Sequence, residues 1–177
     1  MTYIEHGYIQ LYTGNGKGKT SAAFGAALRA ACHGYPVCFI QFLKSGHDQQ
    51  SVSCIPNVDY ICFGKNHETD GWYAPRADDQ PTPEEIVQGW YEAKNRITNN
   101  TYRLIVLDEI NVALSFGYLD LKDVITTLKK RPKSVEIICT GRNAPQELID
   151  LADIATEMQE LHHIYNQGIP AREGFDF

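Results

Sequence analysis

The sequence lacks the cysteine spacing of a metal or redox site. No two of its five cysteines are separated by two residues, and their number is odd. Several lie in apolar runs, which favours reduced, buried thiols in a cytosolic protein. His162 and His163 have no Cys or carboxylate at a matching spacing, which favours a surface or hydrogen-bonding role. The cysteines are Cys32, Cys38, Cys54, Cys62 and Cys139.

Long hydrophobic runs and an excess of basic residues are also missing. No apolar run reaches membrane-spanning length and no signal peptide precedes the first strand-like sequence, so we expect a cytoplasmic protein without a membrane partner. The formal net charge of −6 argues against a broad nucleic-acid surface. There is no internal repeat, and 177 residues suit one domain over 1–177.

A glycine-rich stretch between a strand and a helix is the most informative part of the sequence. Residues 8–13 read as a short strand, and Gly18-Lys19-Thr20 opens an alanine-rich helix. The glycines let successive N–H groups curl around an anion, and the helix directs its positive end toward it. Lys19 would contact the distal phosphates and Thr20 would offer a hydroxyl to Mg²⁺. The predicted phosphate-contacting residues are Gly14, Asn15, Gly16, Lys17, Gly18, Lys19, Thr20 and Ser21.

A second motif follows about ninety residues later. The apolar run 103–107 is followed by Asp108 and Glu109, which is a Walker B pattern in which a carboxylate meets Mg²⁺ or its water shell. Strands often end in acidic turns, so the motif alone is weak. Together with the glycine-Lys-Thr loop, it predicts a magnesium triphosphate site formed by Thr20, Asp108 and Glu109.

The remaining segments alternate between strand-like and helix-like patterns. We predict strands over 37–43, 58–63, 135–139 and 154–158, and helices over 20–32, 83–98, 111–116, 120–130 and 145–152. In the first helix, Phe24 and Leu28 are expected to mark the buried stripe. The alternation predicts an α/β fold: a single P-loop NTPase-like domain with a mostly parallel, doubly wound sheet and helices on both faces. Arg142, after the strand over 135–139, would then reach a phosphate or ribose.

One long stretch, 64–82, has no usable period. Irregular loops of this length in compact domains are often lids or binding loops. The adjacent aromatic residues Trp72 and Tyr73 make it a candidate cover for a flat ligand, although a plain packed loop is equally compatible with the sequence.

Several stretches together resemble the P-loop-type ATP:corrinoid adenosyltransferases. The likeness covers nearly the whole chain, apart from the first residues and the part between Gly46 and Gln88, and the tail motif has no role in generic NTPases. The matching stretches are residues 14–20, 22–25, Arg29, 41–44, 106–111, 140–145, 148–153 and 165–172.

The resemblance implies that the 5′-deoxyadenosyl group of ATP is transferred to Co(I) of a corrinoid, with release of triphosphate. Lys19, Thr20 and Glu109 would be catalytic, and a flavoprotein or other reductase would supply the electrons. The resemblance also implies a homodimer and an aromatic element near the corrin, for which Trp72 and Tyr73 are the nearest candidates. Arg29 matches a position linked to ATP handling, yet it lies about 15 Å along the helix from Lys19 and is expected to act indirectly.

Two other functions remain open at this point. A P-loop ATPase would use Glu109 to activate water, and a nucleotide-switched binding module would bind ATP without forming a product. The sequence does not distinguish cobalamin from an earlier corrinoid such as cobyrinic acid diamide as the acceptor.

Overall fold

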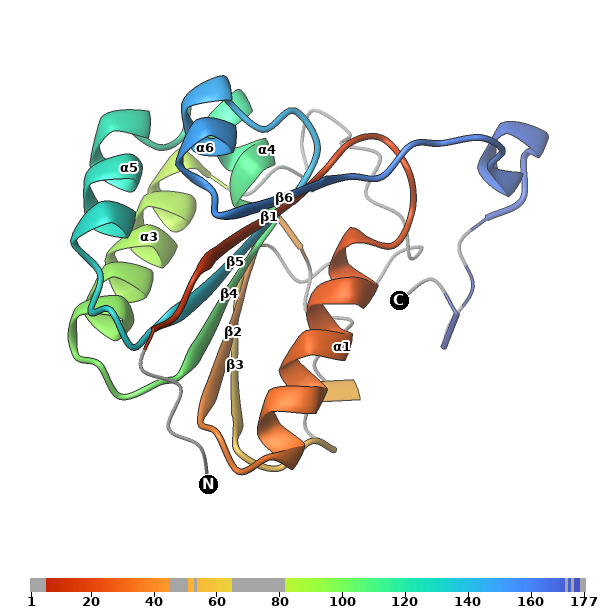
Figure 1. The fold of residues 1–177 in the computed structure, drawn as a ribbon. Coiled ribbons are helices and arrows are strands. Elements are labelled where there is room, and N and C mark those ends of the chain that lie inside the picture. The colour runs from red at the N-terminus through yellow and green to blue at the C-terminus, as the bar shows by residue number, and fades with distance from the viewer. Residues whose placement is uncertain are drawn as a thin grey trace.

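The computed structural model of the chain describes residues 6–44, 51–52, 54–64, 82–170, 172 and 174–175. Its centre is a six-stranded sheet in the order β3-β2-β4-β5-β1-β6, and every neighbouring pair is parallel (Figure 1). The sheet is therefore entirely parallel, where the sequence predicted a mostly parallel one. The strands are β1 (Ile9–Thr13), β2 (Val37–Phe42), β3 (Val58–Phe63), β4 (Leu104–Asp108), β5 (Glu136–Thr140) and β6 (Ile154–Glu157).

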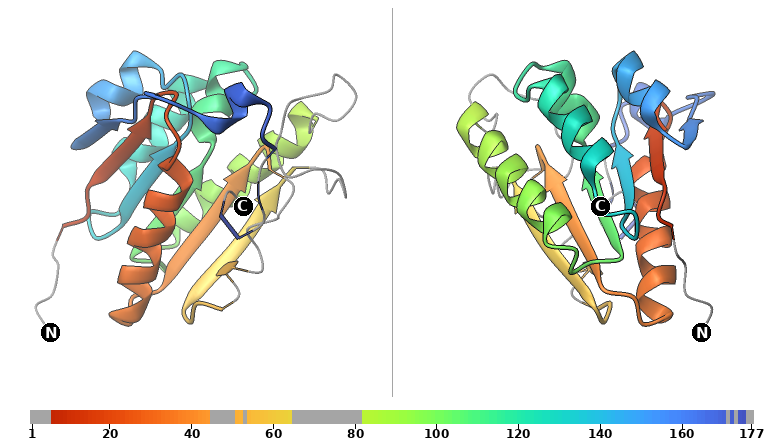
Figure 2. Two further views of the ribbon diagram at one scale, coloured as in Figure 1. Left: turned by 90° about the vertical axis from the view of Figure 1, so that its right-hand side faces the viewer. Right: turned by 60° about the vertical axis from the view of Figure 1, so that its left-hand side comes forward.

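Helices cover both faces of the sheet, as predicted. Figure 2 shows α1 on one face of the sheet and α3, α4, α5 and α6 on the opposite face. The helices are α1 (Lys19–Cys32), α3 (Pro83–Thr98), α4 (Ile110–Ser115), α5 (Leu121–Lys130) and α6 (Gln146–Leu151), and a 3₁₀ turn, η1 (Ile164–Gln167), follows β6. Within the described residues, no helix is both long enough and apolar enough to cross a membrane.

The face of α1 that meets the sheet is made of alanines. Ala23, Ala27 and Ala31 are buried, and small side chains let the helix lie close to β2, β4 and β5. The predicted stripe was wrong at Leu28, which is 45% exposed. Phe24 is only partly buried, although its ring stacks on Phe39.

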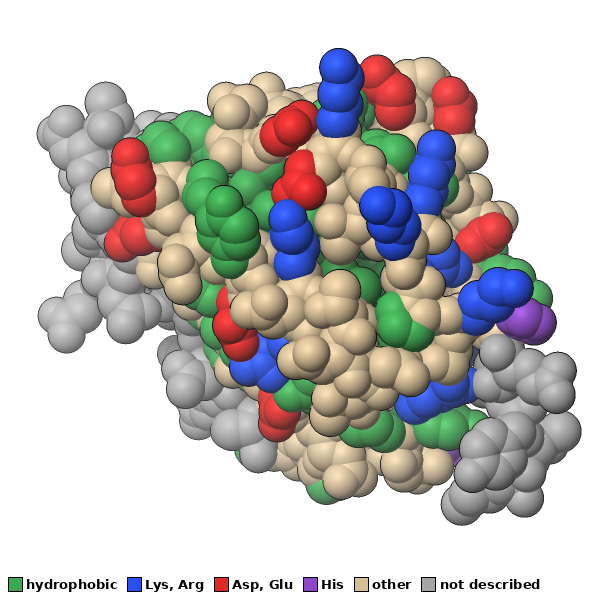
Figure 3. All heavy atoms as spheres, turned by 90° about the vertical axis from the view of Figure 1, so that its left-hand side faces the viewer, with side chains coloured by type: hydrophobic (Ala, Val, Ile, Leu, Met, Phe, Trp, Pro, Cys, Tyr) green, Lys and Arg blue, Asp and Glu red, His purple; other side chains and the backbone are tan. Residues whose placement is uncertain are grey.

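The opposite face holds the larger core. The inward positions of α3 are those predicted from its period, namely Ile86, Trp90, Ala93 and Ile97. The helix begins with a complete capping box between Thr82 and Glu85, followed by Pro83. On the outer surface, basic and acidic side chains are interspersed (Figure 3).

Strand order determines which loops can share a site. In a parallel sheet every strand ends at the same edge, where ligands collect in open α/β folds. β5 lies between β1 and β4, so the ends of these three strands are adjacent. This edge therefore brings together the glycine-rich loop, the Asp108-Glu109 pair and Thr140.

Candidate functional site

The glycine-rich loop joins the end of β1 to the start of α1. Gly14 and Gly18 have φ of 92° and 116°, which favour glycine. Gly18 is the N-cap of α1, so the helix begins directly at the loop and its first N–H groups lie where an anion site would need them. Thr13 occupies the place of the usual first glycine. Its Oγ1 accepts a hydrogen bond from the N–H of Ala144 at 3.3 Å, which connects the loop to the segment after β5.

The segment after β6 runs against this loop. The N–H of Met158 donates to the carbonyl of Thr13 at 2.8 Å, and the N–H of Gly16 donates to the carbonyl of Met158 at 2.7 Å. A Cβ on Gly14 would lie 2.4 Å from the Met158 oxygen, and one on Gly16 would lie 2.7 Å from the Gln159 oxygen. The two glycines therefore permit close packing of the tail, a role that the sequence alone did not indicate.

Lys19 folds back over the loop. Its side chain is buried, and Nζ donates to the carbonyl of Gly16 at 2.6 Å. Burial lowers the pKa of Lys19, while the charge of Glu109 acts in the opposite direction. The ammonium is thus held inside the glycine-rich turn, where a phosphate chain would lie.

Asp108 is the most heavily hydrogen-bonded carboxylate of the site. Its side chain is fully buried at the end of β4. Oδ1 accepts from Thr20 Oγ1 at 2.9 Å and from Thr140 Oγ1 at 2.5 Å. Oδ2 accepts from Gln41 Nε2 at 2.9 Å and from Lys44 Nζ at 2.8 Å. Burial raises the pKa of Asp108, but the Lys44 charge and these hydrogen bonds lower it by more than burial raises it. The pKa therefore lies below its ordinary value, and the carboxylate is ionised.

Residues 41–44 are among the stretches that carry the family resemblance, and Lys44 was expected at the ligand edge of the sheet. Neither Gln41 nor Lys44, however, was named among the predicted site residues. Gln41 is directly opposite Asp108 in the parallel pairing of β2 with β4, and Lys44 follows two residues after β2 ends. Lys44 Nζ also donates to Thr20 Oγ1 at 2.9 Å. A signal was present, because polar residues within and just after an apolar strand point to the ligand edge of the sheet.

Glu109 has a strained backbone. Its φ of 63° is unusual for a residue with a side chain, and it is the N-cap of α4. Its N–H donates to Thr140 Oγ1 at 3.0 Å, which fixes the turn. Burial and the neighbouring Asp108 charge raise the pKa of Glu109, against the charges of Lys44, Lys19 and Arg142. Strain of this kind often accompanies functional turns.

Asn111 closes the same edge of the sheet. It is fully buried in the first turn of α4, and Nδ2 donates to the carbonyl of Gly141 at 2.9 Å and to that of Tyr12 at 3.4 Å. These bonds join the ends of β1 and β5. Oδ1 of Asn111 is buried and has no hydrogen-bond partner among the described residues.

The oxygen atoms at this edge suit Mg²⁺. Thr20 contributes a hydroxyl next to the ionised Asp108, and Glu109 follows directly, so the available donors are hard oxygens. Among the described residues, no group of three or more His, Cys, Asp or Glu is placed to hold a metal ion. A cation here would therefore take its other ligands from water and phosphates, as Mg²⁺ commonly does.

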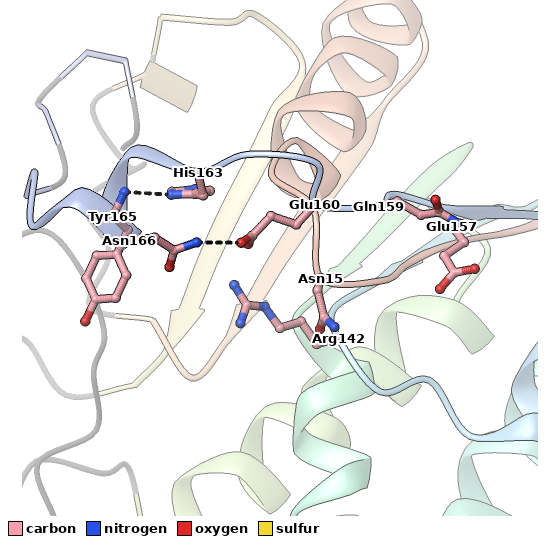
Figure 4. Close-up of a pocket in the computed structure, with 8 residues that line it drawn as sticks. All are labelled: Asn15, Arg142, Glu157, Gln159, Glu160, His163, Tyr165 and Asn166. Carbon is pink, nitrogen blue, oxygen red and sulfur yellow. Dashed lines mark hydrogen bonds between the residues drawn. The ribbon is translucent and has the colours of Figure 1, made fainter.

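A cavity of about 790 Å³ lies beside the glycine-rich loop. Asn15 of the loop and Arg142 of the β5–α6 connection form one side, and the segment after β6 supplies most of the rest (Figure 4). Two hydrogen bonds organise that segment: Tyr165 N–H to His163 Nδ1 at 3.1 Å, and Asn166 Nδ2 to Glu160 Oε1 at 3.0 Å. The lining residues are Asn15, Arg142, Glu157, Gln159, Glu160, His163, Tyr165 and Asn166.

Other predicted site residues within the described part of the chain do not take part in the hydrogen bonds around Asp108. Arg29 is exposed in the last turn of α1. Burial raises the pKa of Tyr12, and the charge of Arg29 acts in the opposite direction. Ser21 is exposed, and Lys17 Nζ donates to the carbonyl of Phe175 at 3.0 Å. Trp72 and Tyr73 lie outside the described residues, so their position relative to the site stays a prediction.

The fold and this edge define the class of protein. A parallel α/β sheet with a glycine-Lys-Thr loop, a buried Asp at the end of a nearby strand and a cavity beside the loop is typical of a P-loop NTPase-like domain. The family model of the ATP:corrinoid adenosyltransferases BtuR/CobO/CobP matches residues 5–177. The chain belongs to this family, whose members are transferases.

Individual relatives agree over nearly the full length. The chain is 36% identical to a corrinoid adenosyltransferase of Sinorhizobium sp. over 177 residues, covering 98% of this chain and 81% of that one. It is 32% identical to the corrinoid adenosyltransferase of Escherichia coli K12, covering 98% and 87%. Among solved structures, flagellar accessory protein FlaH of Methanocaldococcus jannaschii aligns with a TM-score of 0.48 and 14% identity, over 87% of this chain and 72% of that chain.

Proposed function

We propose that the protein transfers the 5′-deoxyadenosyl group of ATP to Co(I) of a corrinoid and releases inorganic triphosphate. The observation that supports this is the meeting of two family-specific stretches at one cavity. Arg142 and Tyr165 both line the cavity beside the loop residue Asn15, although they are distant in sequence. A generic NTPase has no need for the tail, whereas an enzyme with two large substrates needs a second wall.

In this proposal, different residues of the site bind the triphosphate and the metal ion. The loop from Gly14 to Gly18 and the start of α1 would hold the triphosphate, and Lys19 would neutralise charge that develops on it as it leaves. Thr20, Asp108 and Glu109 would hold Mg²⁺, which would further neutralise the phosphate oxygens. Placing the cobalt in line with the ribose C5′ would supply the remaining acceleration.

Further parts of the proposal concern the setting of the reaction. Electrons for Co(I) would come from a flavoprotein or another reductase, the working form would be a homodimer, and the location would be the cytoplasm. The acceptor would be cobalamin or an earlier corrinoid such as cobyrinic acid diamide, used in biosynthesis or salvage.

The products decide between this proposal and its alternatives. The protein is incubated anaerobically with ATP, Mg²⁺ and chemically reduced cobalamin, and the absorbance and the phosphate products are measured. The proposal expects a light-sensitive Co–C bond and one triphosphate for each corrinoid converted. ADP and phosphate would instead indicate the ATPase, and bound ATP without any product would indicate a switch.

A matched pair of variants links the reaction to the loop. Lys19→Ala is expected to abolish turnover while leaving the circular dichroism spectrum unchanged. Lys129→Ala, on the exposed side of α5, is expected to behave as the wild type. Normal turnover in Lys19→Ala would remove the phosphate role from the loop lysine.

A further inference from the structure

Lys44 lies between the two side chains best suited to hold a divalent cation. Its Nζ is 2.9 Å from Thr20 Oγ1 and 2.8 Å from Asp108 Oδ2. The Asp108 side chain is completely buried, and that of Lys44 is 28% exposed. The ammonium therefore contacts both oxygens from the solvent side.

The contact answers an electrostatic requirement. An ionised carboxylate without water around it is costly unless a positive charge lies beside it. Gln41 and Thr140 donate to Asp108 but bring no charge. Among the described groups that donate to Asp108, Lys44 is the one that carries a positive charge.

Because the carboxylate needs only one neighbouring cation, Lys44 and a divalent metal ion compete for the same oxygens. A divalent cation would coordinate the Thr20 and Asp108 oxygens that Lys44 already contacts, and two cations next to one carboxylate repel each other. Lys44 is able to leave, because a lysine head is a point charge on a flexible stem and this one is partly exposed. Asp108 would still keep the donors Gln41 and Thr140.

We propose that the Lys44 ammonium occupies the place of a divalent cation beside Thr20 and Asp108, and so prevents metal from binding there until nucleotide binds. Metal and nucleotide then enter together, and the displaced ammonium turns to the polyphosphate. Lys44 is thus a positioning residue that couples metal binding to nucleotide binding. This inference rests on the proposed function, since it takes ATP with Mg²⁺ to be the ligand.

Metal binding without nucleotide tests the idea directly. Mn²⁺ replaces Mg²⁺ as the probe, and the loss of its free-ion electron paramagnetic resonance signal measures binding to the purified full chain. Wild type is expected to bind Mn²⁺ weakly. Lys44→Gln is expected to bind it at least about tenfold more tightly, because its buried carboxylate has lost the compensating charge. Lys44→Arg keeps the charge and is expected to resemble wild type.

Two further variants locate the effect. The double variant Lys44→Gln/Asp108→Asn is expected to lose the gained affinity, which would place Mn²⁺ at Asp108. Lys129→Gln changes the net charge equally from an exposed position on α5 and is expected to leave Mn²⁺ affinity unchanged. Equal Mn²⁺ affinity in wild type and Lys44→Gln, or a gain that survives the loss of Asp108, would overturn the proposal.

An unstable Lys44→Gln variant is still informative. If it unfolds without metal, Mn²⁺ is expected to raise its melting temperature strongly while having little effect on wild type, and instability that Mn²⁺ does not relieve would contradict the proposal. None of these measurements uses ATP or corrinoid. Failure of adenosyl transfer and failure of the Lys44 inference are therefore separate results.

Discussion

The contact between the glycine-rich loop and the tail predicts a large effect of one methyl group. Gly14 has φ of 92°, and a Cβ there would lie 2.4 Å from the carbonyl oxygen of Met158. The left-handed conformation costs an alanine about 1–2 kcal/mol. Relieving the clash also moves Met158, whose two backbone hydrogen bonds to the loop are each worth about 1 kcal/mol. We therefore expect Gly14→Ala to lower the free energy of unfolding by roughly 2–4 kcal/mol.

Gly25 provides a matched control for the same substitution. It is exposed in the middle of α1, and nothing lies within 4 Å of a Cβ built on it. Alanine is favoured over glycine in a helix, so Gly25→Ala is expected to raise the free energy of unfolding by about 0.5–1 kcal/mol. The two variants differ only in position and are expected to move in opposite directions.

Urea denaturation followed by circular dichroism measures both values, and calorimetric titration with ATP adds a functional readout. ATP affinity is expected to fall at least about tenfold in Gly14→Ala, because the anion cradle is displaced. It should stay at the wild-type level in Gly25→Ala. A Gly14→Ala variant as stable as wild type would refute the inferred packing of tail on loop.

Three more substitutions test the polar contacts, each by urea denaturation. Asp108→Asn places an amide among four donors and removes the partner of Lys44, so we expect a loss of about 3–5 kcal/mol, and a loss under 1 kcal/mol would contradict the burial argument. Thr140→Val keeps the shape but removes the hydroxyl between Asp108 and Glu109, which should cost about 1–3 kcal/mol; an unchanged midpoint would mean that the hydroxyl is dispensable. Asp123→Asn removes the negative charge and one of the two oxygens that accept from Lys94 and Trp90. These hydrogen bonds lower the pKa of Asp123, and the exposure of its side chain limits the loss to about 0.5–1 kcal/mol. A lowered carboxyl pKa stabilises the fold fully above the ordinary value of 3.8, and this stabilisation is lost as pH falls from 3.8 through the lower pKa of the folded state. The difference between Asp123→Asn and wild type should shrink over that range, and a pH-independent difference would contradict this assignment.

Local signals in the sequence were enough for most of the fold. The capping box before α3, the period of its apolar residues and the continuous apolar strands each depend on a few neighbouring residues. The glycine-Lys-Thr loop and the Asp108-Glu109 pair were placed at one sheet edge by the same kind of reasoning, and Thr20 does contact Asp108.

The parts that sequence reasoning missed depend on long-range packing. Leu28 has the right spacing for a buried stripe, but the close approach of α1 to the sheet rotates the alanine row inward instead. Lys44 acquires a role only because β2 pairs with β4 in a register that places Gln41 beside Asp108. The packing of Met158 on the glycine-rich loop follows from the parallel pairing of β6 with β1, which no local pattern encodes.

The hydrogen bonds from the Met158 N–H to the Thr13 carbonyl and from the Gly16 N–H to the Met158 carbonyl have a thermodynamic consequence. One end of this short ladder belongs to the glycine-rich loop, which is the proposed triphosphate site, and the chain beyond Met158 forms a wall of the neighbouring cavity. A ligand that displaces either side of this ladder, in the loop or in the cavity, changes the affinity of the other site for its own ligand. Linkage is reciprocal, so a ligand in the cavity would alter nucleotide affinity by the same factor by which nucleotide alters the affinity of that ligand.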